Sequence, residues 1–255
     1  RFPDDTRRLL PQAQSRRADL GGRGVPLPDP TVTNAWEIEY RNRRYLDDPP
    51  LPFVETILAT AVARGLGSAH GLYIGCGNGR NYLPLVAGGL DLVGLDVSPT
   101  ALAQLAERAP EHASRLVCGD LSVLPRGVQY SVVIAIQSLQ HGKEAATHTE
   151  VKRALGRVEP GGLFCIRVNA AGTEPEYPHT VVEKGSDGRF TVRYLDGPKR
   201  GLDIHFFSAT ELRGLVEVGF IPVLPLRSVV TQRISPKRGH WDQWEGIWQR
   251  EWGSP

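Results

Sequence analysis

Three glycines at alternate positions, Gly75, Gly77 and Gly79, follow the apolar residues 72–74. The apolar run is typical of a buried strand, and the glycines predict a tight turn that side chains would obstruct. A helix is expected to follow at once. The backbone N–H groups of residues 77–80 should then lie near its N-terminus and favour an anionic or strongly polar ligand group. The glycines alone also fit a strand-to-helix turn without a ligand.

A carboxylate follows at the spacing that a ribose site requires. Asp96 ends a second apolar run, about twenty residues after the first glycine. In an open α/β sheet this places the carboxylate beside the glycine turn, where it can accept hydrogen bonds from both hydroxyls of a ribose. The glycine pattern is G-x-G-x-G followed by Arg80, which departs from the G-x-G-x-x-G pattern of dinucleotide sites. The ligand is therefore expected to carry a ribose without being a dinucleotide.

Residues 75–81 resemble the S-adenosylmethionine (SAM) turn of class I methyltransferases, especially the small-molecule and tellurite-resistance-type members. The resemblance continues in the family's order at residues 95–98, 118–121 and 157–162, and so covers residues 71–170. It implies an α/β fold with a doubly wound, mostly parallel seven-stranded sheet. It also implies SAM as cofactor and S-adenosyl-L-homocysteine as product.

The same resemblance implies which residues contact the cofactor. Asp96 would hold the ribose, and Asp120 would accept from the adenine amine with Leu121 against the ring. The expected cofactor-binding residues are Gly75, Cys76, Gly77, Gly79, Arg80, Asn81, Asp96, Val97, Asp120, Leu121 and Gln137.

Methyl transfer from a sulfonium is an in-line displacement that depends mainly on positioning, so few catalytic side chains are expected. His141, just past the fourth strand, is the leading candidate for a base, although it could instead only hydrogen-bond to backbone. His205 is a second candidate. Residues 136–139 lack the N-P-P-Y-type tetrad of many amino-group and nucleic-acid-base methyltransferases. This argues against those acceptor classes. We expect a small-molecule acceptor, methylated on O or N rather than on C or S.

The domain prediction is an N-terminal arm and helical cap over residues 1–70, then a SAM-binding domain over residues 71–255 with a β-hairpin insertion at about 171–207. Residues 1–30 are expected to form a flexible or loosely docked arm. Alternating strand and helix patterns from residue 71 onward predict the parallel sheet. The predicted strands are 71–75, 91–96, 115–118, 129–136, 161–169, 220–233 and 243–250, and the predicted helices are 53–64, 79–88, 99–108, 144–157 and 209–218.

Two segments are expected to cover the site. Trp36, Tyr40 and Tyr45 are predicted on a short helix that starts after Asn34, where they could simply pack the helix onto the domain or form the substrate pocket. The hairpin at 189–207 leaves the sheet at its ligand-binding edge and is expected to cover that pocket.

The C-terminal tail allows two interpretations. Its tryptophans fit a helical stripe, but a seventh, antiparallel strand is preferred from the family's fold, with the rings packing in the core. These residues are Trp241, Trp244, Trp248 and Trp252.

Composition limits the other possibilities. A chain of 255 residues with 40% hydrophobic residues fits one sizeable core, and a net charge of +2 is too mild to indicate nucleic acid. No apolar run is long enough to span a membrane and no signal peptide is evident, so a soluble cytoplasmic protein is expected. Because the sequence contains no methionine, not even at position 1, we expect that a natural start has been removed.

The remaining expectations concern thiols, metals and rival functions. Cys76, Cys118 and Cys165 are expected to be buried free thiols, and no cluster has the sequence spacing of a metal site. Two alternatives remain: an RNA-modifying methyltransferase that uses the arginine-rich N-terminal region, and an NAD(P)-dependent oxidoreductase. The acceptor's identity and the oligomeric state are left open.

Overall fold

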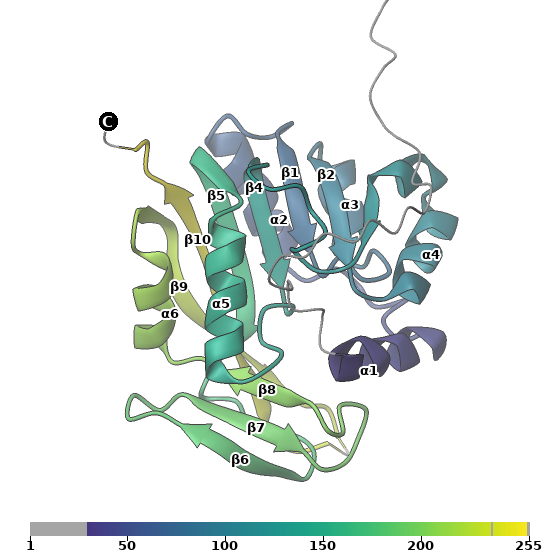
Figure 1. Ribbon diagram of the computed structural model, residues 1–255, viewed down its shortest axis with the longest axis vertical. Helices are drawn as coiled ribbons and strands as arrows, with labels where there is room; N and C mark the ends of the chain where they lie inside the picture. The colour runs from purple at the N-terminus through teal and green to yellow at the C-terminus, as the bar shows by residue number, and fades with distance from the viewer. Residues whose placement is uncertain (1–29, 236, 254–255) are drawn as a thin grey trace, which may run out of the picture.

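The computed structural model describes residues 30–235 and 237–253, so the arm predicted for residues 1–30 lies outside it except for the last residue. A seven-stranded sheet forms the centre of the fold (Figure 1). Its strands are β1 (His70–Ile74), β2 (Asp91–Asp96), β3 (Leu116–Cys118), β4 (Tyr130–Ile136), β5 (Val158–Asn169), β9 (Phe220–Gln232) and β10 (His240–Arg250). Their order is β3-β2-β1-β4-β5-β10-β9, and β10 runs antiparallel to both of its neighbours. This is the predicted doubly wound architecture.

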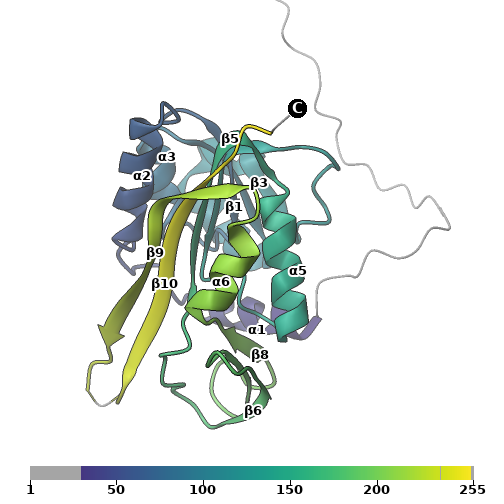
Figure 2. The same cartoon turned by 90° about the vertical axis from the view of Figure 1, so that its left-hand side faces the viewer.

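Helices cover both faces of this sheet, as Figure 2 shows from the side. One face carries α2 (Phe53–Ala63), α3 (Tyr82–Ala87) and α4 (Pro99–Arg108), and the other carries α5 (Glu144–Leu155) and α6 (Ala209–Val216). Alternate residues of a strand point to opposite faces, so β4 contributes to both cores. Val132 and Ile134 pack with α2 to α4, whereas Val133 and Ala135 pack with α5 and α6. Burial on both faces explains why β4 is apolar from Val132 to Ile136.

Capping residues set the start of two helices. Ser98 precedes α4 and its Oγ accepts from the Ala101 N–H at 3.1 Å, while the helix itself begins at Pro99. Ser208 and Glu211 form a reciprocal capping box at the start of α6. The predicted bounds of β2 and α4 are confirmed.

A second, three-stranded sheet follows β5 and is here called the cap sheet. It consists of β6 (His179–Lys184), β7 (Phe190–Tyr194) and β8 (Asp203–Phe206), in that order. The predicted hairpin is β7–β8, and the prediction missed β6. The reason is that β6 is mostly exposed and carries no alternation of buried and exposed residues.

The N-terminal helix α1 (Pro30–Arg41) lies beside the cap sheet at the C-terminal ends of β1, β2 and β4 (Figure 1). Val32 and Ala35 pack on the apolar face of the cap sheet, against a cluster that includes Ile204 and Phe206. The helix begins earlier than predicted. Tyr45 lies outside it, in a turn with φ of 65°.

The C-terminal tail forms strand β10, so the strand interpretation is confirmed and the helical one is wrong. Trp248 is fully buried and Trp244 packs against the core. Trp241 and Trp252 are 40% and 78% exposed, so the prediction that all four rings pack in the core is wrong for these two.

All three cysteines are free thiols. Cys76 and Cys165 are buried as predicted, but Cys118 is exposed at the end of edge strand β3. Among the helices that the structure describes, none combines the length and apolar character needed to cross a membrane.

Candidate functional site

A cavity of about 1190 Å³ opens at the C-terminal ends of the parallel strands, the edge where open α/β sheets bind ligands. The glycine turn, the ends of β2, β3 and β4, the helix α1 and the cap sheet all contribute to its wall. The lining includes every predicted site residue except Gly79 and His205. Segments distant in the sequence therefore converge on one site.

The glycine turn is a close-packed loop. Gly75, Gly77 and Gly79 all have positive φ, at 73°, 55° and 96°. A Cβ at Gly75 would lie 2.5 Å from the Ser138 Cβ, and one at Gly77 would lie 2.5 Å from the Tyr40 Oη. Glycine is required here both by conformation and by the close approach of neighbouring side chains. Gly79 instead faces Leu105 and Leu83, which explains its absence from the cavity wall.

Several backbone N–H groups of this turn donate to acceptors within the chain, which differs from the prediction. Helix α3 begins only at Tyr82. The N–H groups of Gly75 and Cys76 both donate to the Leu95 carbonyl, and that of Gly77 donates to Asp96 Oδ2 at 2.7 Å. The predicted anion site made of free backbone N–H groups of residues 77–80 is therefore wrong at Gly77, whose N–H is already bound to a carboxylate.

Asp96 is held rigidly at the end of β2. Besides the Gly77 bond, its Oδ1 accepts from the Ser98 N–H at 2.9 Å, and the residue is 6% exposed. Burial raises its pKa to about 6, although these backbone hydrogen bonds act in the opposite direction. Each carboxylate oxygen keeps further lone pairs, so the group can still accept from a ligand in the cavity.

The loop after β3 lies next to Asp96. The Gly119 N–H donates to the Asp96 carbonyl at 2.8 Å, and Asp120 Oδ1 accepts from the Ser122 N–H at 2.7 Å. Leu121 is buried. Val97, Asp120 and Leu121 thus line the same part of the wall as Asp96.

Arg80 and Asn81 form hydrogen bonds with the segment between α1 and α2. The Arg80 Nε donates to the Pro49 carbonyl at 2.7 Å, and Asn81 Oδ1 accepts from the Leu51 N–H at 2.9 Å. These contacts hold the segment between α1 and α2 against the glycine turn. Positioning this segment is a role that the sequence did not reveal.

The end of β4 places a histidine in the cavity. Gln137 adopts φ of 58°, a conformation that is uncommon for a residue other than glycine. Four residues later, His141 Nδ1 lies 3.0 Å from the Ser138 carbonyl oxygen, a bond that requires the proton on Nδ1. Its Nε2 is buried and has no hydrogen-bond partner in the described structure, and the same holds for the Ser138 Oγ. Burial and the nearby Lys199 lower the pKa of His141 to about 4.

An aromatic cluster from the N-terminal segment contacts this imidazole through Trp36. The Trp36 ring is 5.3 Å from the His141 ring, edge to face, and 6.0 Å and 6.2 Å from the rings of Tyr40 and Tyr45. The Tyr45 hydroxyl donates to Glu39 Oε2 at 2.9 Å. The structure therefore brings together the three predicted pocket aromatics and His141.

Lys199, on the loop between β7 and β8, was missed by the sequence analysis. Its Nζ lies 5.1 Å from the centre of the Trp36 ring, and burial lowers its pKa. Four other cations of the wall have a carboxylate partner: Arg44 with Glu39, Arg80 with Asp48, Arg153 with Glu150 and Lys237 with Glu176. Over the described residues, Lys199 has no ion pair. No local sequence signal marks this lysine, because its environment comes from α1.

His205 is not in the cavity, and its prediction as a pocket residue is wrong. It is fully buried on β8, with Nδ1 2.8 Å from Thr191 Oγ1 and Nε2 3.0 Å from Glu211 Oε1. Its neighbours Ile204 and Phe206 line the cavity instead. Successive strand residues point to opposite faces, so His205 points away from the cavity.

Comparisons with known proteins agree with this fold. Residues 72–162 match the family model of a methyltransferase domain. No curated protein sequence matches the chain. Among solved structures, a Burkholderia thailandensis 1,6-didemethyltoxoflavin-N1-methyltransferase with bound 1,6-didemethyltoxoflavin and S-adenosylhomocysteine has a TM-score of 0.59 at 20% identity. This match covers 89% of the present chain and 93% of the other.

Two further structures share the fold. The N-methyltransferase NodS from Bradyrhizobium japonicum, in complex with S-adenosylhomocysteine, has a TM-score of 0.55 at 18% identity and covers 87% and 99% of the two chains. The CcbJ methyltransferase from Streptomyces caelestis has a TM-score of 0.55 at 20% identity and covers 81% and 94%. The fold is that of class I SAM-dependent methyltransferases. Within that fold, residues 72–162 are the part of the chain that matches the methyltransferase-domain model.

Proposed function

We propose that this protein transfers a methyl group from SAM to an oxygen or nitrogen atom of a small-molecule acceptor. The observation that carries the proposal is that one cavity is lined both by Asp96, at the expected ribose position, and by His141, whose Nε2 has no partner within the described chain. For methyl transfer, such a cavity has to hold the acceptor in line with the methyl group and to provide a group that accepts the acceptor's proton.

The residues at the sheet edge fit a nucleoside. The rigid Asp96 carboxylate would accept from the ribose hydroxyls, and Asp120 and Leu121 would contact the adenine. The glycine turn would lie against the methionine part, where the contacts of Gly75 with Ser138 and of Gly77 with Tyr40 leave no room for a side chain. Gln137 would contact the cofactor from the end of β4. These roles are proposals that rest on position in the wall.

His141 fits the role of base. SAM, when bound, supplies an electrophilic methyl group on a sulfonium. Since the bond to the Ser138 carbonyl fixes the proton on Nδ1, the lone pair is on Nε2, which is the atom without a partner. A pKa of about 4 keeps the imidazole neutral near pH 7, so Nε2 can accept a hydrogen bond from an acceptor O–H or N–H. The same low pKa makes His141 a weak base, so it would take the proton only as the methyl group bonds to the acceptor and makes that proton acidic.

Lys199 supports an acceptor that carries a negative charge or a strongly electron-rich group. Burial lowers the pKa of the Lys199 ammonium, while the carboxylates of Glu39 and Glu176 attract it without forming an ion pair among the described residues. A direct anionic partner from outside the chain would therefore stabilise the charged form. The Trp36 face beside it would stack on a planar acceptor. We therefore propose an aromatic or heteroaromatic acceptor that bears an acidic group.

The structural relatives support a small molecule. One is named as a methyltransferase of 1,6-didemethyltoxoflavin, which is bound in that structure together with S-adenosylhomocysteine. For the present chain, calorimetry should detect binding of SAM and S-adenosylhomocysteine but not of NAD or NADP. Incubation with methyl-labelled SAM and fractionated metabolites should then label a small acidic aromatic compound. Transfer of the label to RNA alone would contradict the proposal.

A further inference from the structure

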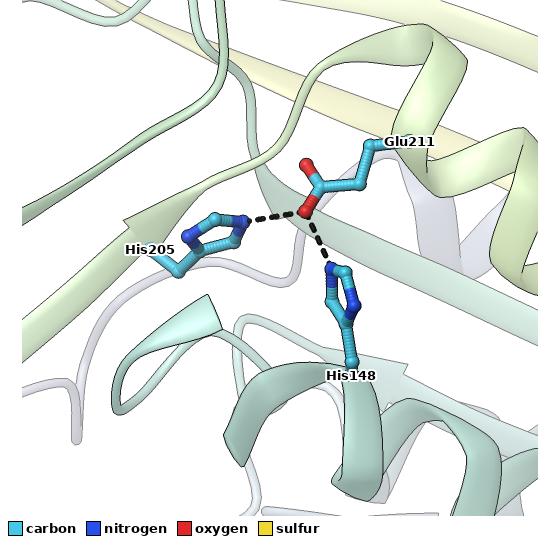
Figure 3. Close-up of side chains that lie close together, drawn as sticks. All are labelled: His148, His205 and Glu211. Atoms are coloured by element: carbon cyan, nitrogen blue, oxygen red, sulfur yellow. Dashed lines mark hydrogen bonds and ion pairs between the residues drawn. The ribbon is translucent and has the colours of Figure 1, made fainter. Parts of the chain in front are cut away.

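A second group of functional side chains lies outside the cavity, where α5, β8 and α6 meet. Figure 3 shows His148, His205 and Glu211 directed at one another. Their nearest nitrogen and oxygen atoms all lie within 4.8 Å of one another. His148 and Glu211 are 63 residues apart in sequence, which explains why no spacing pattern predicted the group. We propose that these three residues bind a divalent transition-metal ion of the Zn²⁺ type.

The donor set fits such an ion. Two imidazole nitrogens and one carboxylate oxygen are ligands that Zn²⁺ takes in sites with three protein ligands and one water. Mg²⁺ and Ca²⁺ prefer sites built from oxygen atoms and are poorly served by this group. Glu211 Oε1 lies 2.5 Å from His148 Nε2 and 3.0 Å from His205 Nε2, so it stands near the place that an ion would take. Ligand atoms around a tetrahedral Zn²⁺ lie about 3.3 Å apart, so the ion would require Glu211 Oε1 to withdraw modestly from both imidazoles.

The surroundings orient these ligands. His205 Nδ1 contacts Thr191 Oγ1 at 2.8 Å, and a proton on Nδ1 that donates to this hydroxyl leaves the Nε2 lone pair for the ion. Glu211 Oε2 is held by the Ser208 N–H at 3.2 Å, so only Oε1 is directed at the histidines. The side chains of His205 and Glu211 are 0% and 4% exposed, whereas that of His148 is 24% exposed. Solvent can therefore reach the fourth position from the His148 side.

The local charge also permits a cation. The Arg189 Nε lies 3.7 Å from Glu211 Oε1, but this guanidinium is paired with Glu144 at 3.0 Å and with Asp187 at 2.7 Å. With both histidines neutral, the three ligands carry one negative charge. An ion would compensate this charge in a buried place.

The ion would also fix one wall of the cavity. His205 faces the metal ligands, while Ile204 and Phe206 on the opposite face of β8 line the cavity. The ion would connect α5, β8 and α6, and so hold the cap sheet at the position where it closes the acceptor end. The site belongs to the scaffold, and the methyl-transfer chemistry does not pass through it.

Titration with Zn²⁺ alone tests the proposal on the full chain after dialysis against a chelator. Calorimetry should give one Zn²⁺ per chain, and Mg²⁺ should give no binding. Co²⁺ in place of Zn²⁺ should produce the visible absorption of a site with few, tetrahedral ligands. Zn²⁺ should also slow hydrogen exchange at residues 203–206.

Two conservative variants separate a metal site from a purely hydrogen-bonded cluster. Glu211→Gln can keep the capping box, because glutamine serves at this position, and His148→Gln keeps a hydrogen-bond donor toward Glu211. Each should bind Zn²⁺ at least about tenfold more weakly than the wild type. His112→Ala, which removes a histidine on another part of the surface, should bind as the wild type does.

The proposal is overturned if the wild type binds no stoichiometric Zn²⁺, or if both glutamine variants bind it as tightly as the wild type does. Binding of SAM should persist in both variants, because none of the three residues lines the cavity. Failure of the metal site would therefore leave the proposed methyl transfer intact, and the reverse also holds.

Discussion

The Tyr40 hydroxyl lies directly over Gly77, at a place where a Cβ on residue 77 would be only 2.5 Å away. Helix α1 is thus in van der Waals contact with the glycine turn. Polar contacts reinforce this position, since Gln104 Nε2 on α4 donates to the Tyr40 carbonyl at 2.7 Å and Glu37 accepts from the Ser98 hydroxyl at 2.6 Å. The helix that covers the cavity and the turn that would hold the cofactor form one packed unit.

We predict that Gly77→Ala weakens SAM binding at least about tenfold, because it displaces either the turn or the Tyr40 ring. Gly65→Ala is the matched control. Gly65 also has positive φ, 73°, but an added Cβ there meets nothing within 4 Å. Both variants share the conformational cost of about 1–2 kcal/mol, so calorimetry should show the loss of affinity only for Gly77→Ala. Equal SAM affinity in the two variants would mean that the Tyr40 contact does not matter.

Asp96 leads to a pH prediction. Because its pKa is raised to about 6 in the folded chain, the free protein gains stability from the neutral carboxyl at low pH. About 3 kcal/mol of this stability is lost as the pH rises through about 6. Ribose hydroxyls need the ionised form, so SAM affinity should change in the opposite direction and fall about tenfold between pH 7.5 and pH 5. His141 does not titrate in this window, since its pKa is about 4.

The variant Asp96→Asn tests this interpretation. At pH 7.5 it should bind SAM about 10- to 100-fold more weakly, because charge-assisted hydrogen bonds become neutral ones. Its affinity should also be nearly the same at pH 5. Calorimetry at the two pH values is the measurement, and an unchanged pH dependence in the variant would remove Asp96 from the ribose site.

The sequence predictions were accurate where neighbouring residues determine the structure, and they failed where contacts between distant residues determine it. The bounds of β2 and α4 were predicted correctly because local signals set them: an apolar run that ends in Asp96, and a cap at Ser98 followed by proline. The family resemblance implied the seven-stranded, mostly parallel sheet that the structure contains. Strand β6 was missed because Val181 and Val182 are both exposed, so its sequence shows no buried face.

The site could be predicted only in part for the same reason. Gly77, Asp96 and His141 belong to motifs that follow strands, and they line the cavity as expected. The orientation of His205 depends on the register of β8, and a change of one residue exchanges the two faces of a strand. Lys199 and Glu211 receive their surroundings from α1 and α5, elements far away in the chain. No local pattern encodes such long-range contacts.

Lys199 and His141 should be coupled. The positive charge of Lys199 lowers the pKa of His141, after burial the larger cause. Lys199→Met removes the charge and keeps the apolar stem, so the pKa of His141 should rise above about 4. Nitrogen-15 NMR titration measures this directly and also reports whether the proton is on Nδ1. Lys143→Met, on the exposed surface outside the cavity wall, is the control and should leave the pKa unchanged.

We predict that α1 and the cap sheet close over the cavity when ligands bind. Val32 and Ala35 of α1 pack on the cap-sheet cluster that includes Ile204. We therefore expect α1 and the cap sheet to respond to ligands as one unit. Hydrogen exchange in residues 31–45 and 189–207 should slow when SAM and an acceptor are both present. An α1 that only packs the fold would instead exchange at the same rate with and without ligands.

The variant Trp36→Ala distinguishes the acceptor end of the cavity from the cofactor end. Trp36 contacts His141 and Lys199 at the acceptor end, whereas Asp96 and the glycine turn form the proposed cofactor end. The variant should therefore bind SAM within about threefold of the wild type but lose methyl transfer by about 10- to 100-fold, because the acceptor would no longer be held in line with the methyl group. Exposed Trp252→Ala is the matched control and should change neither quantity. If Trp36→Ala weakens SAM binding as much as it weakens turnover, the ring belongs to the cofactor end, and the acceptor must enter elsewhere.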